Sequence, residues 1–272
     1  MINLKKLFRN IKIDLNKSIF SFGFAICIIV TFLLCFTSVI YTDGRTGREY
    51  SVFQIIIDMQ KFRHISPEAE SVFRASVNHY LTIFLPILSA FPYVTFFCSE
   101  RVSGCIRMSI SRSGKLSYYT AKFISATISG GFAVMVGYIL YGFVIYNIFP
   151  SNSASLIGFL KLSFGMLLYG AISVLPAFFL SAFIKNKYII CCFPFIIMHF
   201  YYTMLSRIQD KFISTNNWNA VMKMSFLYPN SIREIFETGN DRLLVLCFYV
   251  YLAVISFIGF TIIMNWRFDY GE

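Results

Sequence analysis

Six stretches of the chain contain no Asp, Glu, Lys or Arg over 19 to 27 consecutive residues. They cover residues 18–41, 75–98, 123–149, 162–184, 188–206 and 243–264. A helix of about 20 apolar residues crosses the hydrocarbon core of a bilayer and satisfies its own backbone hydrogen bonds there. The pattern therefore predicts an all-α membrane protein with six transmembrane helices.

Composition supports this assignment. The chain has 57% hydrophobic and 14% charged residues, too little polar side chain to cover a soluble globule of 272 residues. A net charge of +11 would indicate a nucleic-acid partner in a soluble protein. In a membrane protein the same charge indicates orientation instead, and we expect no nucleic-acid partner.

The distribution of charge between the loops predicts which side each loop occupies. If the N-terminus is cytoplasmic, 13 of the 24 Lys and Arg and four acids fall in the inside segments 1–17, 99–122, 185–187 and 265–272. The other 11 bases and nine acids fall in the outside loops 42–74, 150–161 and 207–242. By the positive-inside rule we expect a multi-pass cell-membrane protein with both termini in the cytoplasm.

The first apolar stretch could also be a cleavable signal peptide, because basic residues precede it. Its 24 residues exceed the usual apolar segment of about 7–15, and no small-residue cleavage pattern follows Tyr41. The seven cysteines all fall within or beside the spans rather than in the outside loops, so no disulfide framework is expected. No Cys/His spacing suggests a metal site.

The segment before the first span has the spacing of an amphipathic helix. One face carries Leu4, Leu7, Phe8, Ile11 and Leu15, and the other carries Lys5, Arg9, Lys12 and Asn16. This pattern is typical of a helix that lies in the membrane interface, with its bases near anionic lipid head groups. A disordered basic tail that only sets topology is the alternative, but the regular apolar stripe favours an interfacial helix over residues 1–17.

The longest inside segment, 99–122, carries five bases and one acid. A turn between two spans needs only a few residues, so we expect a short helix at the cytoplasmic surface. A solvated basic turn that merely follows the positive-inside rule is the alternative.

Several residues in this segment resemble the membrane subunits of type II ABC exporters. They are Glu100, Gly104, the Ser111–Arg112 pair and Ala121–Lys122. The layout is similar too, with an interfacial N-terminal helix, six spans and a long second-to-third loop. The resemblance implies that loop 99–122 holds a coupling helix seated in a separate ATPase subunit, near Glu100, Arg101, Gly104, Arg107, Ser111 and Arg112. Glu100 could instead simply pair with Arg101 or a neighbouring base.

The resemblance also implies the partners. ATP and Mg²⁺ would bind the ATPase subunit, this chain would hold no cofactor, and a second permease copy or a sister permease would complete the pathway.

A capping-box pattern precedes the last span. Ser231 and Glu234 stand three residues apart before Ile235 and Phe236, and Gly239 follows. The pattern predicts a short helix just outside the last span, a position where type II exporters have short, partly re-entrant helices. An ordinary capped loop helix is the alternative.

Missing motifs narrow the function. No Walker A sequence occurs, so the chain is not expected to be an enzyme that hydrolyses ATP. The spans contain no acid or base and only His79 and His199, which argues against an ion-coupled carrier. His79 and Cys98 share one span but would lie about 28 Å apart along a helix, too far for a catalytic pair.

We therefore expect the membrane-spanning permease of an ATP-driven exporter that moves an amphiphilic or hydrophobic substrate outward. An antimicrobial or other peptide, for export or self-immunity, is the first expectation, and lipid, glycan or multidrug export is the alternative. An ion channel or pore without an ATPase partner is the alternative of another class, although no ring of pore-lining charges is apparent.

Overall fold

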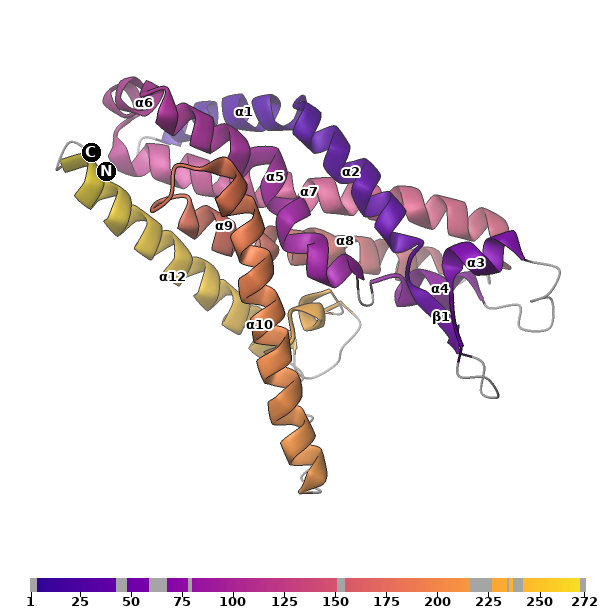
Figure 1. Ribbon diagram of the computed structural model, residues 1–272. Helices are drawn as coiled ribbons and strands as arrows, with labels where there is room; N and C mark the ends of the chain where they lie inside the picture. Colours follow the sequence, from indigo (N-terminus) through magenta and orange to yellow (C-terminus); the bar gives the residue numbers. More distant parts are fainter. Residues whose placement is uncertain are drawn as a thin grey trace.

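The computed structural model describes residues 4–42, 48–58, 68–77, 80–150, 155–215, 227–233, 235–236 and 242–269. Five helices within these residues are long and apolar enough to cross a bilayer, or six if the bent pair α1 (Leu4–Ile19) and α2 (Phe22–Cys35) forms one span (Figure 1). The protein is therefore a multi-pass, mainly α-helical membrane protein.

Small elements follow α2. Strands β1 (Val39–Thr42) and β2 (Glu49–Ser51) form an antiparallel pair in which Thr42 lies opposite Glu49, and two short helices come next, α3 (Val52–Ile57) and α4 (Ala69–Ala75). The remaining elements are α5 (Tyr80–Val102), α6 (Cys105–Ser113), α7 (Lys115–Ile148), α8 (Ser155–Ser173), α9 (Leu175–Leu180), α10 (Lys187–Ser214), the 3-10 helix η2 (Pro229–Ile232) and α12 (Arg242–Asp269).

Helix α7 is the centre of the bundle and packs against α1, α2, α5 and α8. Two adjacent glycines allow the neighbouring backbones to come close. A Cβ atom on Gly130 would lie 2.4 Å from the Ser89 carbonyl oxygen of α5, and one on Gly131 would lie 2.4 Å from the Leu167 carbonyl oxygen of α8. Any side chain at either position would push the helices apart.

Proline shapes the contact between α5 and the N-terminal helices. Pro92 has no N–H, so it leaves the Leu88 carbonyl of α5 without its helical donor. The Cys27 thiol of α2 donates to that carbonyl at 3.0 Å, and the Ser18 hydroxyl of α1 donates to the Pro92 carbonyl at 3.3 Å. Side chains of neighbouring helices thus bond to the backbone near Pro92, as membrane helices require.

The expectation of one helix over 18–41 is wrong at both ends. Ser21 caps α2 by accepting a hydrogen bond from the Phe24 N–H at 3.1 Å, and α1 and α2 meet there at a bend of 60°. Beyond Cys35 the chain enters β1, where β-branched Val39 and Ile40 suit a strand. Helix α2 alone has 14 residues, fewer than the sequence pattern implied.

The other spans also have different bounds from those expected. Helix α5 begins at Tyr80 rather than near 75, α7 begins at Lys115 rather than 123, and α8 begins at Ser155 rather than 162. Pro176 stands at the start of α9, which breaks the fourth span into two helices. Helix α10 continues to Ser214, past the expected end at 206, and α12 runs from Arg242 to Asp269 rather than from 243 to 264.

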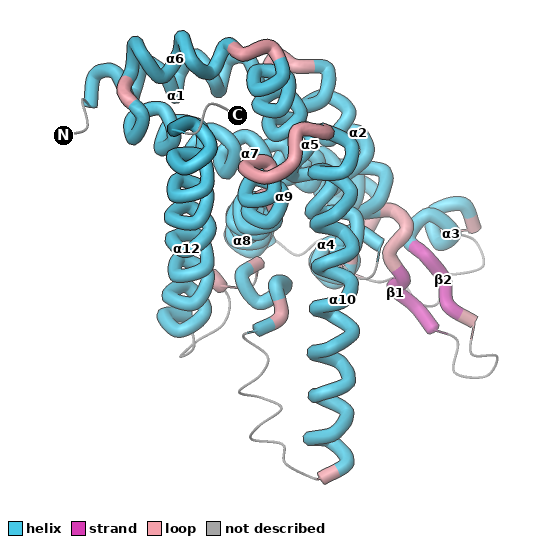
Figure 2. The backbone as a smooth tube through the Cα atoms, turned by 60° about the vertical axis from the view of Figure 1, so that its left-hand side comes forward, coloured by secondary structure: helices cyan, strands magenta, loops and turns pink. Residues whose placement is uncertain are grey.

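Helices α10 and α12 are poorly covered by the rest of the chain. Only 22% and 17% of their membrane-length windows are buried, against 56% to 67% for the spans at α5, α7 and α8–α9. Figures 1 and 2 show α10 leaving the bundle along much of its length. Both helices therefore expose apolar faces that suit lipid or a second membrane protein.

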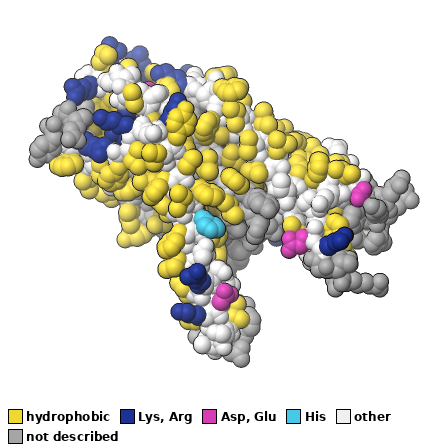
Figure 3. Space-filling model, viewed as in Figure 1, with side chains coloured by type: hydrophobic (Ala, Val, Ile, Leu, Met, Phe, Trp, Pro, Cys, Tyr) yellow, Lys and Arg dark blue, Asp and Glu magenta, His cyan; other side chains and the backbone are white. Residues whose placement is uncertain are grey.

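One end of the bundle is basic. Helices α1 and α6 lie there together with the C-terminal part of α12 (Figure 2). Figure 3 shows Lys and Arg gathered at this end, while hydrophobic side chains cover the middle of the visible surface.

Candidate functional site

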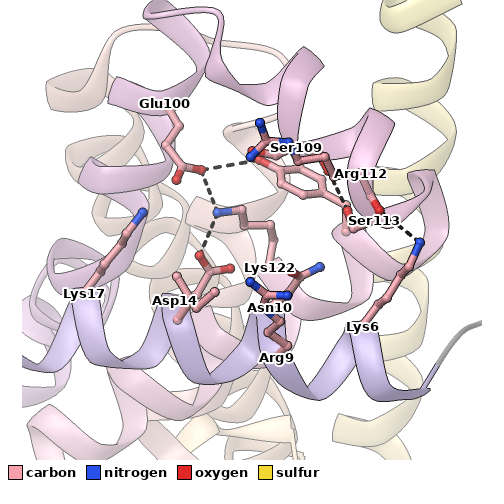
Figure 4. Close-up of a pocket in the computed structure, with 12 residues that line it drawn as sticks. Lys6, Arg9, Asn10, Asp14, Lys17, Glu100, Ser109, Arg112, Ser113 and Lys122 are labelled. Carbon is pink, nitrogen blue, oxygen red and sulfur yellow. Dashed lines mark hydrogen bonds and ion pairs between the residues drawn. The ribbon is translucent and has the colours of Figure 1, made fainter.

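A buried ion cluster joins three helices at the α1–α6 end (Figure 4). The Lys122 ammonium of α7 lies 3.0 Å from Asp14 Oδ1 of α1 and 2.6 Å from Glu100 Oε2 of α5. The Lys122 side chain is only 3% exposed, and those of Asp14 and Glu100 are 8% and 16% exposed. We call these three residues the ion cluster.

Aromatic side chains enclose the ion cluster. The Tyr93 hydroxyl donates to Asp14 Oδ2 at 3.2 Å, and the Tyr118 hydroxyl donates to Glu100 Oε2 at 3.4 Å. The Lys122 ammonium lies 5.1 to 5.8 Å from the ring centroids of Tyr93, Phe96 and Tyr118, within cation–π range. Such packing shields the ion pairs from water on the side away from the cavity and strengthens their electrostatic interaction.

The cluster contains one more acid than base. Burial raises the pKa of the Asp14 carboxyl above its ordinary value, because desolvation penalises the charged form. The ammonium of Lys122 opposes that shift, and the nearby Glu100 carboxylate adds to it. Asp14 is therefore the member of the cluster that holds a proton more readily than a free aspartate would.

A polar cavity of about 410 Å³ opens beside the ion cluster. Helix α1 contributes Lys6, Arg9, Asn10, Ile13, Asp14 and Lys17, α5 contributes Glu100, α6 contributes Ser109, Arg112 and Ser113, and α7 contributes Tyr118 and Lys122. We call this space the α1–α6 cavity. Lys6 also donates to the Arg112 carbonyl oxygen at 3.1 Å and so ties α1 to the end of α6.

The expected short helix in segment 99–122 is confirmed as α6. Gly104 and Gly114 set its limits, because their positive φ angles of 72° and 85° turn the chain where other residues rarely can. Ile106 and Ile110 of α6 are buried in one cluster with residues of α5, α7 and α9. The helix is thus held firmly against the spans.

The candidate coupling residues divide into two groups. Gly104, Arg107, Ser111 and Arg112 are exposed at or on α6. The other two candidates, Glu100 and Arg101, point inward from the end of α5. Glu100 binds Lys122, and Arg101 Nη1 donates to the carbonyls of Ser181, at the end of α9, and Ile184.

The five apolar residues expected on the interfacial helix also divide. Leu4 and Phe8 are 64% and 67% exposed, so they can contact lipid. Leu7, Ile11 and Leu15 are half-buried on the side of α1 that turns toward the bundle.

Among the described residues before the last span, the helix expected to begin after Ser231 is not found. The 3-10 helix η2 ends at Ile232, whereas the capping box predicts a helix that begins after Ser231. Ile235 is buried and Phe236 is exposed, and both are in turns. Glu234 lies outside the described residues, as does Gly239.

A second cavity, of about 390 Å³, lies between α8, α9, α10 and α12. Its lining is almost entirely apolar and includes Phe179, Ile197, Phe248, Leu252 and Ile255. We call it the apolar cavity. Tyr201, Tyr249 and Ser256 are its only lining residues with polar side chains, so it suits the apolar part of an amphiphile.

The uncharged stretches contain no acid or base, but the helices that include them carry buried charges at the α1–α6 end. The sequence places Asp14 before the first uncharged stretch and places Glu100 and Lys122 between the second and the third, but α1, α5 and α7 extend through these positions. A signal for Asp14 was present, since it is the only acid in a basic helix and follows Leu7 and Ile11 at helical spacing. No signal in the sequence pairs it with Lys122.

Comparisons with known proteins give no family. No protein-family model matches the chain, and a search of curated proteins finds no match. Among the described residues no group of His, Cys, Asp and Glu could hold a metal ion.

Proposed function

We propose that this chain is the permease subunit of an ATP-driven exporter, with ATP and Mg²⁺ bound by a separate ATPase subunit. The observation that carries the proposal is the position of α6. It is a short exposed helix between two long spans, and buried Ile106 and Ile110 hold it to the bundle. A protein that moved α6 would move α5 and α7 with it.

The outer surface of α6 supplies the contact for the ATPase. Arg107, Met108 and Ser111 are exposed there, and Met108 is 63% exposed. The ion cluster lies near α6 and joins α1 to α5 and α7. ATP binding and hydrolysis would shift the equilibrium between two states of the bundle, provided that the ATPase contacts α6 differently in each.

The apolar cavity supports an amphiphilic or hydrophobic cargo. An antimicrobial or other peptide with apolar side chains is our first choice, and a lipid, glycan or drug is the alternative. The exposed faces of α10 and α12 support a second permease copy or a sister permease beside this chain. On this proposal the chain lies in the cell membrane with α1, α6 and the end of α12 on the cytoplasmic side.

The test begins with purification of the tagged chain from its native membrane and identification of the proteins that accompany it. We expect an ATPase whose activity rises when it is assembled with the chain. Arg107→Glu and Met108→Glu should lower that activity several-fold, since each introduces a charge that opposes the contact. Lys211→Glu is the control, because Lys211 is exposed near the far end of α10.

The proposal is wrong if no ATPase accompanies the chain, or if both α6 variants retain the full activity of the assembled complex. A steady ion conductance of the purified chain in planar bilayers, without an ATPase, would instead establish the channel alternative.

A further inference from the structure

The α1–α6 cavity has an excess of positive charge. Four exposed bases surround it, Lys6, Arg9 and Lys17 from α1 and Arg112 from α6. A fifth lining cation, Lys122, is neutralised by Glu100 and Asp14. With one base and two acids in the ion cluster, the formal charge of the lining residues is +3.

Helix α1 turns a separate face toward this cavity. Lys6, Arg9, Asn10, Ile13 and Lys17 recur at helical spacing on it. Leu4 and Phe8, which are exposed, belong to a different face of the helix. The bases therefore face the gap between α1 and α6 rather than the surface that suits lipid tails.

The cavity also holds a donor without a partner. The side-chain nitrogen of Asn10 is buried and has no hydrogen-bond partner among the described residues. A buried amide that lacks an acceptor is unfavourable, so such a group commonly has a ligand or water. Among the described residues, no carboxylate pairs with the guanidinium of Arg9 or Arg112 either.

We propose that the α1–α6 cavity binds a phosphate group, held by Arg9 from α1 and Arg112 from α6, with the Asn10 amide as a further neutral donor once its side chain turns toward the ligand. Guanidinium groups bind phosphate oxygens through paired, charge-assisted hydrogen bonds. Lys6 and Lys17 add long-range attraction. The phosphate comes either from the head group of an anionic phospholipid or from a free phosphate compound in the surrounding water, and both present the same oxygens.

Such a ligand would act on the exporter's moving parts. It would join α1 to α6 next to the ion cluster and so stabilise the arrangement of α1, α5, α6 and α7 seen here. The binding itself does not depend on the proposed function, because it needs neither an ATPase nor a transported substrate.

The experiment uses the full chain in nanodiscs and measures its thermal unfolding midpoint. One arm adds inorganic phosphate to phosphatidylcholine nanodiscs, with chloride at equal ionic strength as the reference. The other arm compares nanodiscs that contain phosphatidylglycerol with those of phosphatidylcholine alone. The cavity variant is Arg9→Gln with Arg112→Gln, and the matched control is Lys5→Gln with Lys12→Gln, two exposed α1 bases that do not line the cavity.

We expect phosphate, phosphatidylglycerol or both to raise the unfolding midpoint of the wild-type chain. The cavity variant should need at least ~10-fold more phosphate for the same shift, or lose the lipid effect, because two charge-assisted contacts are gone. The control should stay within about twofold of wild type, since its screened surface charges make no such contacts. A response to phosphate alone identifies a free ligand, and a response to phosphatidylglycerol alone identifies a lipid head group.

Two results would overturn the proposal. One is the absence of any shift in both arms. The other is an equal loss in the cavity and control variants, which would mean that general surface charge, and not the cavity, attracts the anion. A chain that binds phosphate as proposed but has no ATPase partner would leave this inference standing while removing the proposed function.

Discussion

The Lys122 ammonium and the Glu100 carboxylate lie 2.6 Å apart across the junction of α7 and α5, and both side chains are largely buried. Asp14 completes the cluster from α1 at 3.0 Å. One cation thus joins α1 to two helices that come much later in the sequence. Removing that cation would leave two carboxylates buried without compensation.

Lys122→Met is therefore expected to destabilise the protein by about 3–5 kcal/mol, the usual effect of breaking a buried ion pair. The triple variant Lys122→Met, Asp14→Asn, Glu100→Gln removes all three charges and should recover much of this loss. The measurement is reversible unfolding in mixed detergent micelles. A triple variant less stable than Lys122→Met would show that the charges themselves stabilise the native bundle.

Asp14 should make the stability depend on pH. Its pKa is raised in the folded protein, so the folded state binds a proton that the unfolded state has already released. The stabilisation is complete below the ordinary aspartate pKa and is lost as the pH rises through the raised value. Relative to Asp14→Asn, the unfolding midpoint of the wild type should therefore fall as the pH rises from about 4 toward neutral. A constant difference over that range would contradict the raised pKa.

Gly131 should be intolerant of any side chain. A Cβ atom there would lie 2.4 Å from the Leu167 carbonyl oxygen, and a Cβ atom on Gly170, also on α8, would lie 3.0 Å from the Gly131 Cα atom. Gly131→Leu should lower the unfolding midpoint strongly and reduce the yield of folded protein, since overpacking typically costs about 1–3 kcal/mol and here meets backbone. Gly158→Leu is the milder comparison, because its nearest neighbour is the flexible Glu70 side chain at 3.2 Å. Equal effects of the two changes would mean that α7 and α8 can separate easily.

Much of the bundle follows from the sequence because lipid imposes one strong rule on the backbone. An uncharged stretch is helical where it crosses the bilayer, and every such stretch contains at least part of a helix. The ends are less predictable, since local groups decide them. Ser21 starts a new helix inside the first stretch, and Pro176 starts another inside the fourth.

The candidate site was predictable only in part. Gly104 and Gly114 indicate the limits of α6, because glycine permits the positive φ that both turns need. The ion cluster requires α1, α5 and α7 to meet, and that packing is a long-range property that no local pattern encodes. A rule based on charge-free spans also overlooks Lys122, because its charge ends the uncharged stretch even though the helix continues through it.

Cys105 offers a direct test of orientation. It is exposed at the start of α6, whereas Cys98, seven residues earlier on α5, is buried. With the other cysteines replaced by Ala, a membrane-impermeant maleimide should label Cys105 in inside-out vesicles and leave it unlabelled in right-side-out vesicles. Cys98 alone should react slowly in both. The reverse pattern for Cys105 would place α6 outside the cell and remove the proposed contact with a cytoplasmic ATPase.

The apolar cavity offers a test of the cargo. Leu252 lines it from α12, so Leu252→Trp would fill part of the space between α9 and α10. If the cavity holds the apolar part of the cargo, this change should raise the concentration of cargo needed for half-maximal ATPase stimulation by about tenfold or more, equivalent to about 1.4 kcal/mol. Leu246→Trp makes the same replacement on an exposed part of α12 that does not line the cavity, and it should leave that concentration unchanged. Equal responses of the two variants would place the cargo elsewhere, because the volume of the apolar cavity would then make no difference to binding.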